Sequence, residues 1–105
     1  MKDYRKIAED FARHLKAKYG DRIERIVLFG SVARGGYRED SDIDLLVVTA
    51  GDWLHLQSDL AHEAVDVLLN DGVVVSPLVI SSEEAARLPG TGFGRELARE
   101  GLAVA

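Results

Sequence analysis

A segment that combines glycine, serine and aspartate, residues 30–44, constrains the fold of this chain more than any other feature. The apolar runs on either side of it, residues 26–29 and 45–48, have the composition of buried strands. Gly30-Ser31 therefore stands where one predicted strand ends, and Asp42-Ile43-Asp44 stands where the next begins. Because alternate residues of a strand point to the same side, both carboxylates are predicted to face one site at the end of a sheet.

The spacing of these residues predicts chemistry on a phosphate compound. A glycine lets the backbone approach a phosphate closely, and the position after it is where a helix N-terminus directs amide groups at an anion. Phosphoryl-transfer sites usually hold Mg²⁺ with one or two carboxylates plus substrate phosphates, and a pair of ions is one arrangement of such sites. The candidate phosphate-binding residues are Gly30, Ser31 and Arg34, and the candidate catalytic and metal-binding residues are Asp42 and Asp44.

Length and composition indicate one domain, residues 1–105, with a single core. The formal net charge of −5 argues against general affinity for nucleic acid. A metal-bound nucleotide is still a compatible ligand, because the metal ion reverses the local charge balance. The chain has no cysteine, and so no disulfide or thiolate metal site is expected. No apolar run is long enough to cross a bilayer and no signal peptide is recognisable, and we therefore expect a cytoplasmic protein.

Helical spacing and strand composition alternate along the chain and predict an α/β fold with a short mixed sheet. Residues 35–40 form a polar loop in this interpretation, and Glu39 and Asp40 are expected to be solvated. The second strand is apolar at almost every position and is predicted to be buried on both faces, whereas Pro77 restricts the third strand to an edge or a bulge. The predicted strands are residues 23–29, 43–49 and 73–80, and the predicted helices are residues 3–19, 31–34, 53–71, 82–88 and 93–100.

The segment from Trp53 to Asp71 allows two interpretations. Its periodicity favours an amphipathic helix, with the alternative being a strand over residues 65–69 that forms a hairpin with residues 73–80. In the helix, the apolar face consists of Trp53, Leu56, Leu60, Ala64, Val67 and Leu68. The opposite, solvated face consists of Asp59, Glu63, Asp66 and Asn70.

Gly-Ser, ten residues and Asp-x-Asp together resemble the nucleotidyltransferase superfamily related to DNA polymerase β, in particular its minimal members, the MntA-type antitoxins of HEPN/MNT pairs. Residues 29–35 and 41–45 around the motif also resemble that family, and residues 93–101 do so more weakly. The resemblance implies Mg²⁺-dependent transfer of a nucleoside monophosphate from a triphosphate, with ATP as the expected donor, to an acceptor hydroxyl. It also implies a helical HEPN-type toxin as partner, whose tyrosine hydroxyl can be the acceptor. Whether the chain forms a homo-oligomer is left open.

One expected feature of active family members, a third carboxylate on a later strand beside the aspartate pair, is not obvious. Asp66 in Val65-Asp66-Val67 has a similar local sequence, but the helix interpretation places it on a solvated face. If residues 73–80 form the third strand, Ser76 occupies the expected position of the acid, and a serine cannot act as the usual base.

Three hypotheses about function therefore compete with the alternative that Asp42 and Asp44 have a purely structural role. The first is an active nucleotidyltransferase, and the second is an antitoxin that neutralises its partner by binding alone. The third is a nucleotide sensor, or one piece of a transferase that assembles from two polypeptides. In that structural alternative, Asp42 and Asp44 only cap a turn. The presence of Gly30-Ser31 at the motif's spacing before the aspartate pair argues against it.

Overall fold

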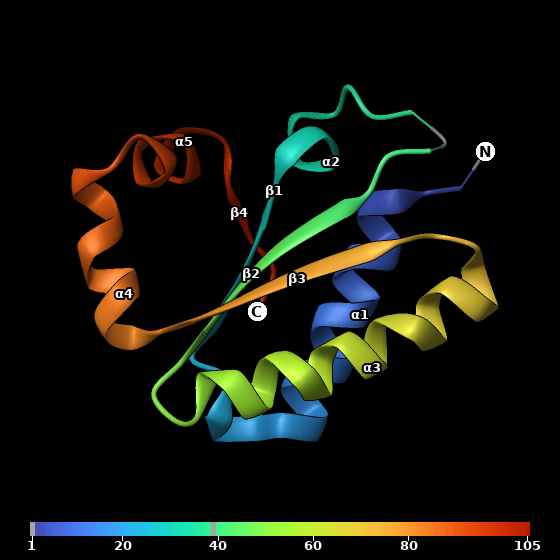
Figure 1. Ribbon diagram of the computed structural model, residues 1–105. Helices are drawn as coiled ribbons and strands as arrows, with labels where there is room; N and C mark the ends of the chain where they lie inside the picture. The colour runs from blue at the N-terminus through green and yellow to red at the C-terminus, as the bar shows by residue number, and fades with distance from the viewer. Residues whose placement is uncertain (1, 39) are drawn as a thin grey trace.

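A computed structural model describes residues 2–38 and 40–105, and it confirms a mixed sheet flanked by helices (Figure 1). The prediction made for Glu39 lies outside the described residues. The sheet has the order β3-β2-β1-β4, in which β1 is antiparallel to both neighbours and β2 is parallel to β3. Its strands are β1 (Arg25–Phe29), β2 (Ile43–Thr49), β3 (Val75–Ser81) and β4 (Leu102–Ala103).

Helices cover the sheet on both sides. In Figure 1, α1 (Tyr4–Tyr19) and α3 (Trp53–Asp71) lie together on one side, and α4 (Ser82–Arg87) and α5 (Gly92–Glu100) lie on the other. The short helix α2 (Gly30–Arg34) follows β1 directly, and two 3₁₀ turns, η1 (Gly20–Arg22) and η2 (Leu88–Gly90), complete the described elements. None of the described helices combines the length and apolar character that a membrane span requires.

The central strand β2 is buried on both faces, as its continuous apolar sequence predicts. Leu45 and Val47 belong to the core that Phe11 and Leu15 of α1 share with Leu56 and Leu60 of α3. The intervening Leu46 points to the opposite side, where it lines a cavity together with residues of α5 and η2. Each buried leucine contributes about 1.5–3 kcal/mol, and so β2 holds the two helical layers together.

Strand β3 forms an edge of the sheet, which confirms the position predicted from Pro77. A proline lacks an N–H group and therefore loses no ladder hydrogen bond where the backbone faces outward. The side-chain amide of Gln57 on α3 donates to the Pro77 carbonyl at 2.9 Å and accepts from the Val79 N–H at 2.8 Å. These contacts satisfy groups that an exposed edge would offer to another chain.

The helical interpretation of residues 53–71 is confirmed, but three of its side chains lie differently from the prediction. Glu63 was predicted on the solvated face and is only 6% exposed. Trp53 and Leu68 were predicted on the buried face, yet they are 46% and 45% exposed. The reason is that α3 packs against α1 as well as the sheet, and the contact with α1 turns Glu63 inward.

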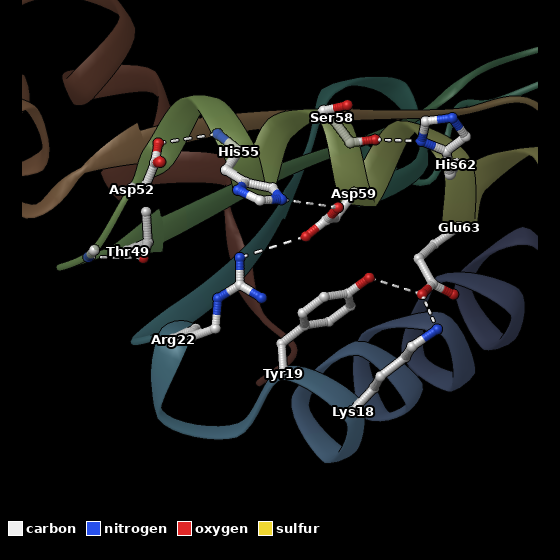
Figure 2. Close-up of polar contacts among 11 residues, drawn as sticks. Lys18, Tyr19, Arg22, Thr49, Asp52, His55, Ser58, Asp59, His62 and Glu63 are labelled. Carbon is white, nitrogen blue, oxygen red and sulfur yellow. Dashed lines mark hydrogen bonds and ion pairs between the residues drawn. The ribbon is translucent and has the colours of Figure 1, made fainter.

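Glu63 joins α3 to the C-terminal half of α1 (Figure 2). The Tyr19 hydroxyl donates to Glu63 Oε2 at 2.8 Å, His14 Nε2 lies 2.9 Å from Oε1, and the Lys18 ammonium pairs with Oε2. Burial alone would raise the pKa of Glu63, but the hydrogen bonds from Lys18, His14 and Tyr19 outweigh it and lower the pKa to about 2. The carboxylate is therefore an ionised, fully bonded link between the two helices.

The sequence patterns also missed one strand and misplaced the starts of two others. The strand β4 was not predicted, since its two residues, Leu102 and Ala103, carry no alternating pattern of their own. It forms because Leu102 pairs with Leu28 of β1. The first strand begins at Arg25 rather than Ile23 because the turn η1 extends to Arg22, and the third begins at Val75 rather than Val73.

Candidate active site

Gly30, where the chain turns at the end of β1, lies against Asp44. Phe29, the last residue of β1, pairs with Asp44 of β2, so that Gly30 follows directly beside Asp44. Gly30 has a φ of +77°, and an ideal Cβ atom on it would lie 2.4 Å from Asp44 Oδ2. Both the backbone angle and the available space therefore require glycine at this position.

Asp42 directly precedes β2, and Asp44 is the second residue of that strand. Asp42 is exposed and Asp44 is partly buried. Burial raises the pKa of Asp44, the negative charge of Asp42 raises it further, and the positive charge of Arg34 lowers it in part. A cation bound between the two carboxylates would offset the cost of burying the Asp44 charge and the repulsion between Asp44 and Asp42. The pair therefore has the chemistry of a divalent metal site.

The number of protein ligands at this position is limited. Among residues 2–38 and 40–105, no three or more His, Cys, Asp or Glu side chains cluster in a way that could hold a metal ion. A Mg²⁺ ion at Asp42 and Asp44 would therefore complete its coordination with water and substrate phosphates. Mg²⁺ is commonly bound in this way, because it keeps several waters and prefers one or two carboxylates.

The other candidate residues lie on α2, next to this pair. Ser31 is in the first turn of the helix and Arg34 in the last. Arg34 Nη1 lies 3.4 Å from Glu100 Oε2 at the end of α5, and an Arg5 hydrogen bond to the Ala33 carbonyl at 3.0 Å ties α2 to α1. The structure thus places Gly30, Asp42 and Arg34 close to Asp44, and Ser31 follows Gly30 in the chain. The contacts with α5 and α1 fix the position of α2.

Ser76 and Asp66, the two positions considered for a third acid, lie in different places. Ser76 of β3 pairs with Asp44 in the parallel ladder, which agrees with its predicted position beside the aspartates. Asp66 is exposed on α3, where it lines a groove of about 390 Å³ together with residues of α1 such as Asp10. Asp66 is therefore on a helix that flanks the sheet, and the strand next to Asp44 carries a serine.

Comparison with known proteins decides the family. The nucleotidyltransferase domain family matches residues 5–88, which include the whole Gly30–Asp44 segment. The chain belongs to the nucleotidyltransferase family. A relative from Methanocaldococcus jannaschii, named "Putative protein adenylyltransferase MJ0604", is 41% identical over 96 residues, which cover 91% of this chain and 92% of the relative.

Solved structures show the same nucleotidyltransferase fold. One is described as "Crystal structure of the toxin-antitoxin with AMP-PNP", with a TM-score of 0.55 and 22% identity over 92% of this chain and 72% of that one. Another, a mutant of the toxin-antitoxin MntA-HpeT, has a TM-score of 0.55 and 19% identity over the same shares of the two chains. At these identities the likeness establishes the fold of this nucleotidyltransferase.

The sequence patterns did not place α5 of this nucleotidyltransferase beside the corner. The contact arises from β4, which was not predicted and whose pairing with β1 brings the preceding helix back to Phe29. Phe93 of α5 packs edge-to-face on Phe29, with ring centroids 5.3 Å apart. The weak family resemblance of residues 93–101 was the one sequence signal that pointed to this segment.

Replacing Gly30 by alanine is expected to lower nucleotidyl transfer by about 100-fold, because the new Cβ must displace the Asp44 carboxylate, and misplaced catalytic groups cost about this much. Gly35→Ala is the matched control. Gly35 also has a positive φ, +88°, but an ideal Cβ on it would meet nothing within 4 Å. Both variants should lose about 1–2 kcal/mol of stability in denaturant unfolding through the backbone penalty. Gly30→Ala should lose more than Gly35→Ala, because its Cβ also displaces the Asp44 carboxylate. Equal activity in the two variants would contradict the role given to the Gly30–Asp44 contact.

Asp66→Asn is expected to leave nucleotidyl transfer within about twofold of the wild type, because Asp66 is an exposed residue of α3. The measurement is the initial rate of label transfer at saturating nucleotide. A loss of 100-fold or more, which is the order expected when a general base is removed, would show that Asp66 supplies the third acid after all.

Proposed function

We propose that this nucleotidyltransferase is a Mg²⁺-dependent protein adenylyltransferase, residues 1–105 acting as one catalytic domain in the cytoplasm. It would transfer AMP from ATP to a hydroxyl group of a partner protein. The observation that carries the proposal is the contact between the Gly30 corner and the Asp44 carboxylate. The 41% identity to a relative named as a protein adenylyltransferase supports the choice of nucleotide and of acceptor class.

Each candidate residue has a distinct task in this reaction. Gly30 lets the triphosphate approach the backbone, Ser31 offers a hydroxyl group to it, and Arg34 supplies positive charge. Asp42 and Asp44 hold Mg²⁺, which when bound neutralises phosphate charge and the developing charge of the leaving group. The acceptor oxygen forms a bond to the α-phosphorus as the hydroxyl proton passes to water. The bond from that phosphorus to the oxygen that bridges to the β-phosphate breaks, and pyrophosphate leaves.

The proposed acceptor is a tyrosine hydroxyl on a helical HEPN-type toxin, for which this chain acts as antitoxin. Two structures with the same fold come from toxin–antitoxin pairs, and one of them contains AMP-PNP. A domain of this size has little surface beyond the phosphate site with which to select an acceptor. Selection by a separate partner protein is consistent with that limit.

The test is incubation of the purified chain with ATP, Mg²⁺ and the product of the neighbouring gene. Label in the α-phosphate should appear on the partner, label in the γ-phosphate should not, and removal of Mg²⁺ by EDTA should stop transfer. The double variant Asp42→Ala with Asp44→Ala should be inactive. Transfer of the γ-label, or transfer that survives in the double variant, would rule the mechanism out.

A second candidate is an antitoxin that neutralises its partner by binding alone. The specific observation in its favour is that Ser76, and not an acidic residue, pairs with Asp44. In that case the double aspartate variant would still protect cells from the partner. Loss of protection by a variant that still forms the complex would exclude this candidate.

A further inference from the structure

A cavity of about 200 Å³ opens beside Gly30, and Asp44 is not part of its lining. Its lining includes Phe29, Gly30, Arg34, Phe93, Glu96 and Glu100. In the sheet, β1 lies between β2 and β4, so that Asp44 approaches the end of β1 from one side and the end of α5 approaches it from the other. A triphosphate that rests on Gly30 therefore has the metal site on one side and this cavity on the other.

The walls of the cavity are held in place by contacts within the chain. The rings of Phe29 and Phe93 pack at an angle of 78°. Arg34 pairs with Glu100 at 3.4 Å, which joins α2 to the end of α5, and the pairing of Leu28 with Leu102 anchors the segment that follows. A site fixed in this way needs little reorganisation when a ligand enters.

We infer that this cavity receives the base of the nucleoside triphosphate, and that it favours a purine with an exocyclic amino group. The inference rests on the proposed function, because it takes a triphosphate at Gly30 as its starting point. The volume suits a single heterocyclic base, since sites that enclose whole drug-sized ligands measure about 300–1,000 Å³. Phe93 is only partly buried, and it offers ring surface on which a base can stack.

The preference for an amino group follows from the two carboxylates. Glu100 already pairs with Arg34, whereas within the described part of the chain Glu96 makes no ion pair. An ionised carboxylate accepts hydrogen bonds and cannot donate them. Glu96 therefore selects a base edge that presents an N–H donor, as the amino group of adenine does.

The first experiment separates recognition of the base from recognition of the phosphates. Affinities for ATP and for inorganic tripolyphosphate are measured by calorimetry with Mg²⁺ present, in the wild type and in Phe93→Ala. We expect Phe93→Ala to weaken ATP binding by about tenfold, the effect of losing one stacking contact, and to leave tripolyphosphate binding unchanged. Trp53→Ala is the matched control, because Trp53 is a partly exposed aromatic residue on α3 that does not line the cavity.

The second experiment tests the amino group. Wild-type affinity should be higher for ATP than for purine riboside triphosphate, which lacks the amine, and Glu96→Ala should reduce that preference by about fivefold. Glu83→Ala, an exposed residue of α4, is the control.

Four results would overturn the inference, and they differ in what they say about the proposed function. If ATP binds no more tightly than tripolyphosphate, or if Phe93→Ala weakens both equally, the cavity is not a base site while the phosphate site stands. If Glu96→Ala leaves the preference for ATP unchanged, selection of the amino group by Glu96 is wrong. If the wild type binds neither ligand, the phosphate site itself falls, and the inference falls with it.

Discussion

Asp44→Asn is expected to lower the rate of nucleotidyl transfer by about 1,000-fold, or about 4 kcal/mol in the activation barrier, while the protein stays folded. Asparagine has nearly the same shape, but it removes one of the two negative charges at the start of β2. The fold should tolerate the change, since burial and the nearby Asp42 charge raise the pKa of Asp44 and so oppose its ionised form. The expected loss is therefore in the binding of metal and in chemistry, not in stability.

The measurement is the initial rate of α-label transfer at several Mg²⁺ concentrations, with denaturant unfolding as the test of stability. Asp40→Asn is the matched control, because Asp40 is an exposed aspartate just before the pair. Part of the lost rate should return at higher Mg²⁺, since one carboxylate remains. If Asp44→Asn transfers label as fast as the control variant, Asp44 does not hold the metal.

The link between Glu63 and α1 is expected to contribute about 3 kcal/mol to stability near neutral pH, because the Glu63 pKa is lowered to about 2 from an ordinary value of 4.5. A lowered carboxylate pKa stabilises the folded state above the unfolded-state pKa. That contribution is lost as the pH falls from about 4.5 to about 2 and the folded-state carboxylate takes up its proton. The three donors, Lys18, His14 and Tyr19, are the physical source of the effect.

Glu63→Gln mimics the protonated side chain and tests this directly. The free energy of unfolding in urea, measured for wild type and variant between pH 2 and pH 7, should differ by about 3 kcal/mol at pH 6–7 and by little near pH 2. Glu83→Gln, at an exposed carboxylate, should change stability by less than about 0.5 kcal/mol at every pH. A wild-type advantage that stays constant with pH would mean that the ionised Glu63 is not what stabilises the helix pair.

Local sequence determined the part of the fold that carries the candidate site. The apolar run of β2 and the Gly-Ser corner after β1 predicted which strand ends meet, because strand period and turn chemistry are local properties. Pro77 likewise predicted an edge strand. These features place Gly30, Asp42 and Asp44 together without knowledge of the rest of the chain.

Features that depend on distant partners could not be predicted in this way. Helical periodicity assigned Glu63 to the solvated face because it cannot register that α1 offers three donors to that position. Trp53 was assigned to the core for the converse reason, since none of the described elements packs over the start of α3 closely enough to bury it. The strand β4 exists through its pairing with β1, and so the wall that α5 adds beside Gly30 emerged only from the structure.

The central claim is that one pocket formed by Gly30, Ser31, Asp42 and Asp44 holds a metal-bound triphosphate. A crystal of the protein with Mn²⁺ in place of Mg²⁺ and a non-hydrolysable ATP analogue tests it most directly. The account predicts an anomalous Mn²⁺ signal in contact with Asp42 and Asp44, with the triphosphate lying along Gly30 and the start of α2. Metal and nucleotide bound elsewhere, for example in the acidic groove between α1 and α3, would contradict it.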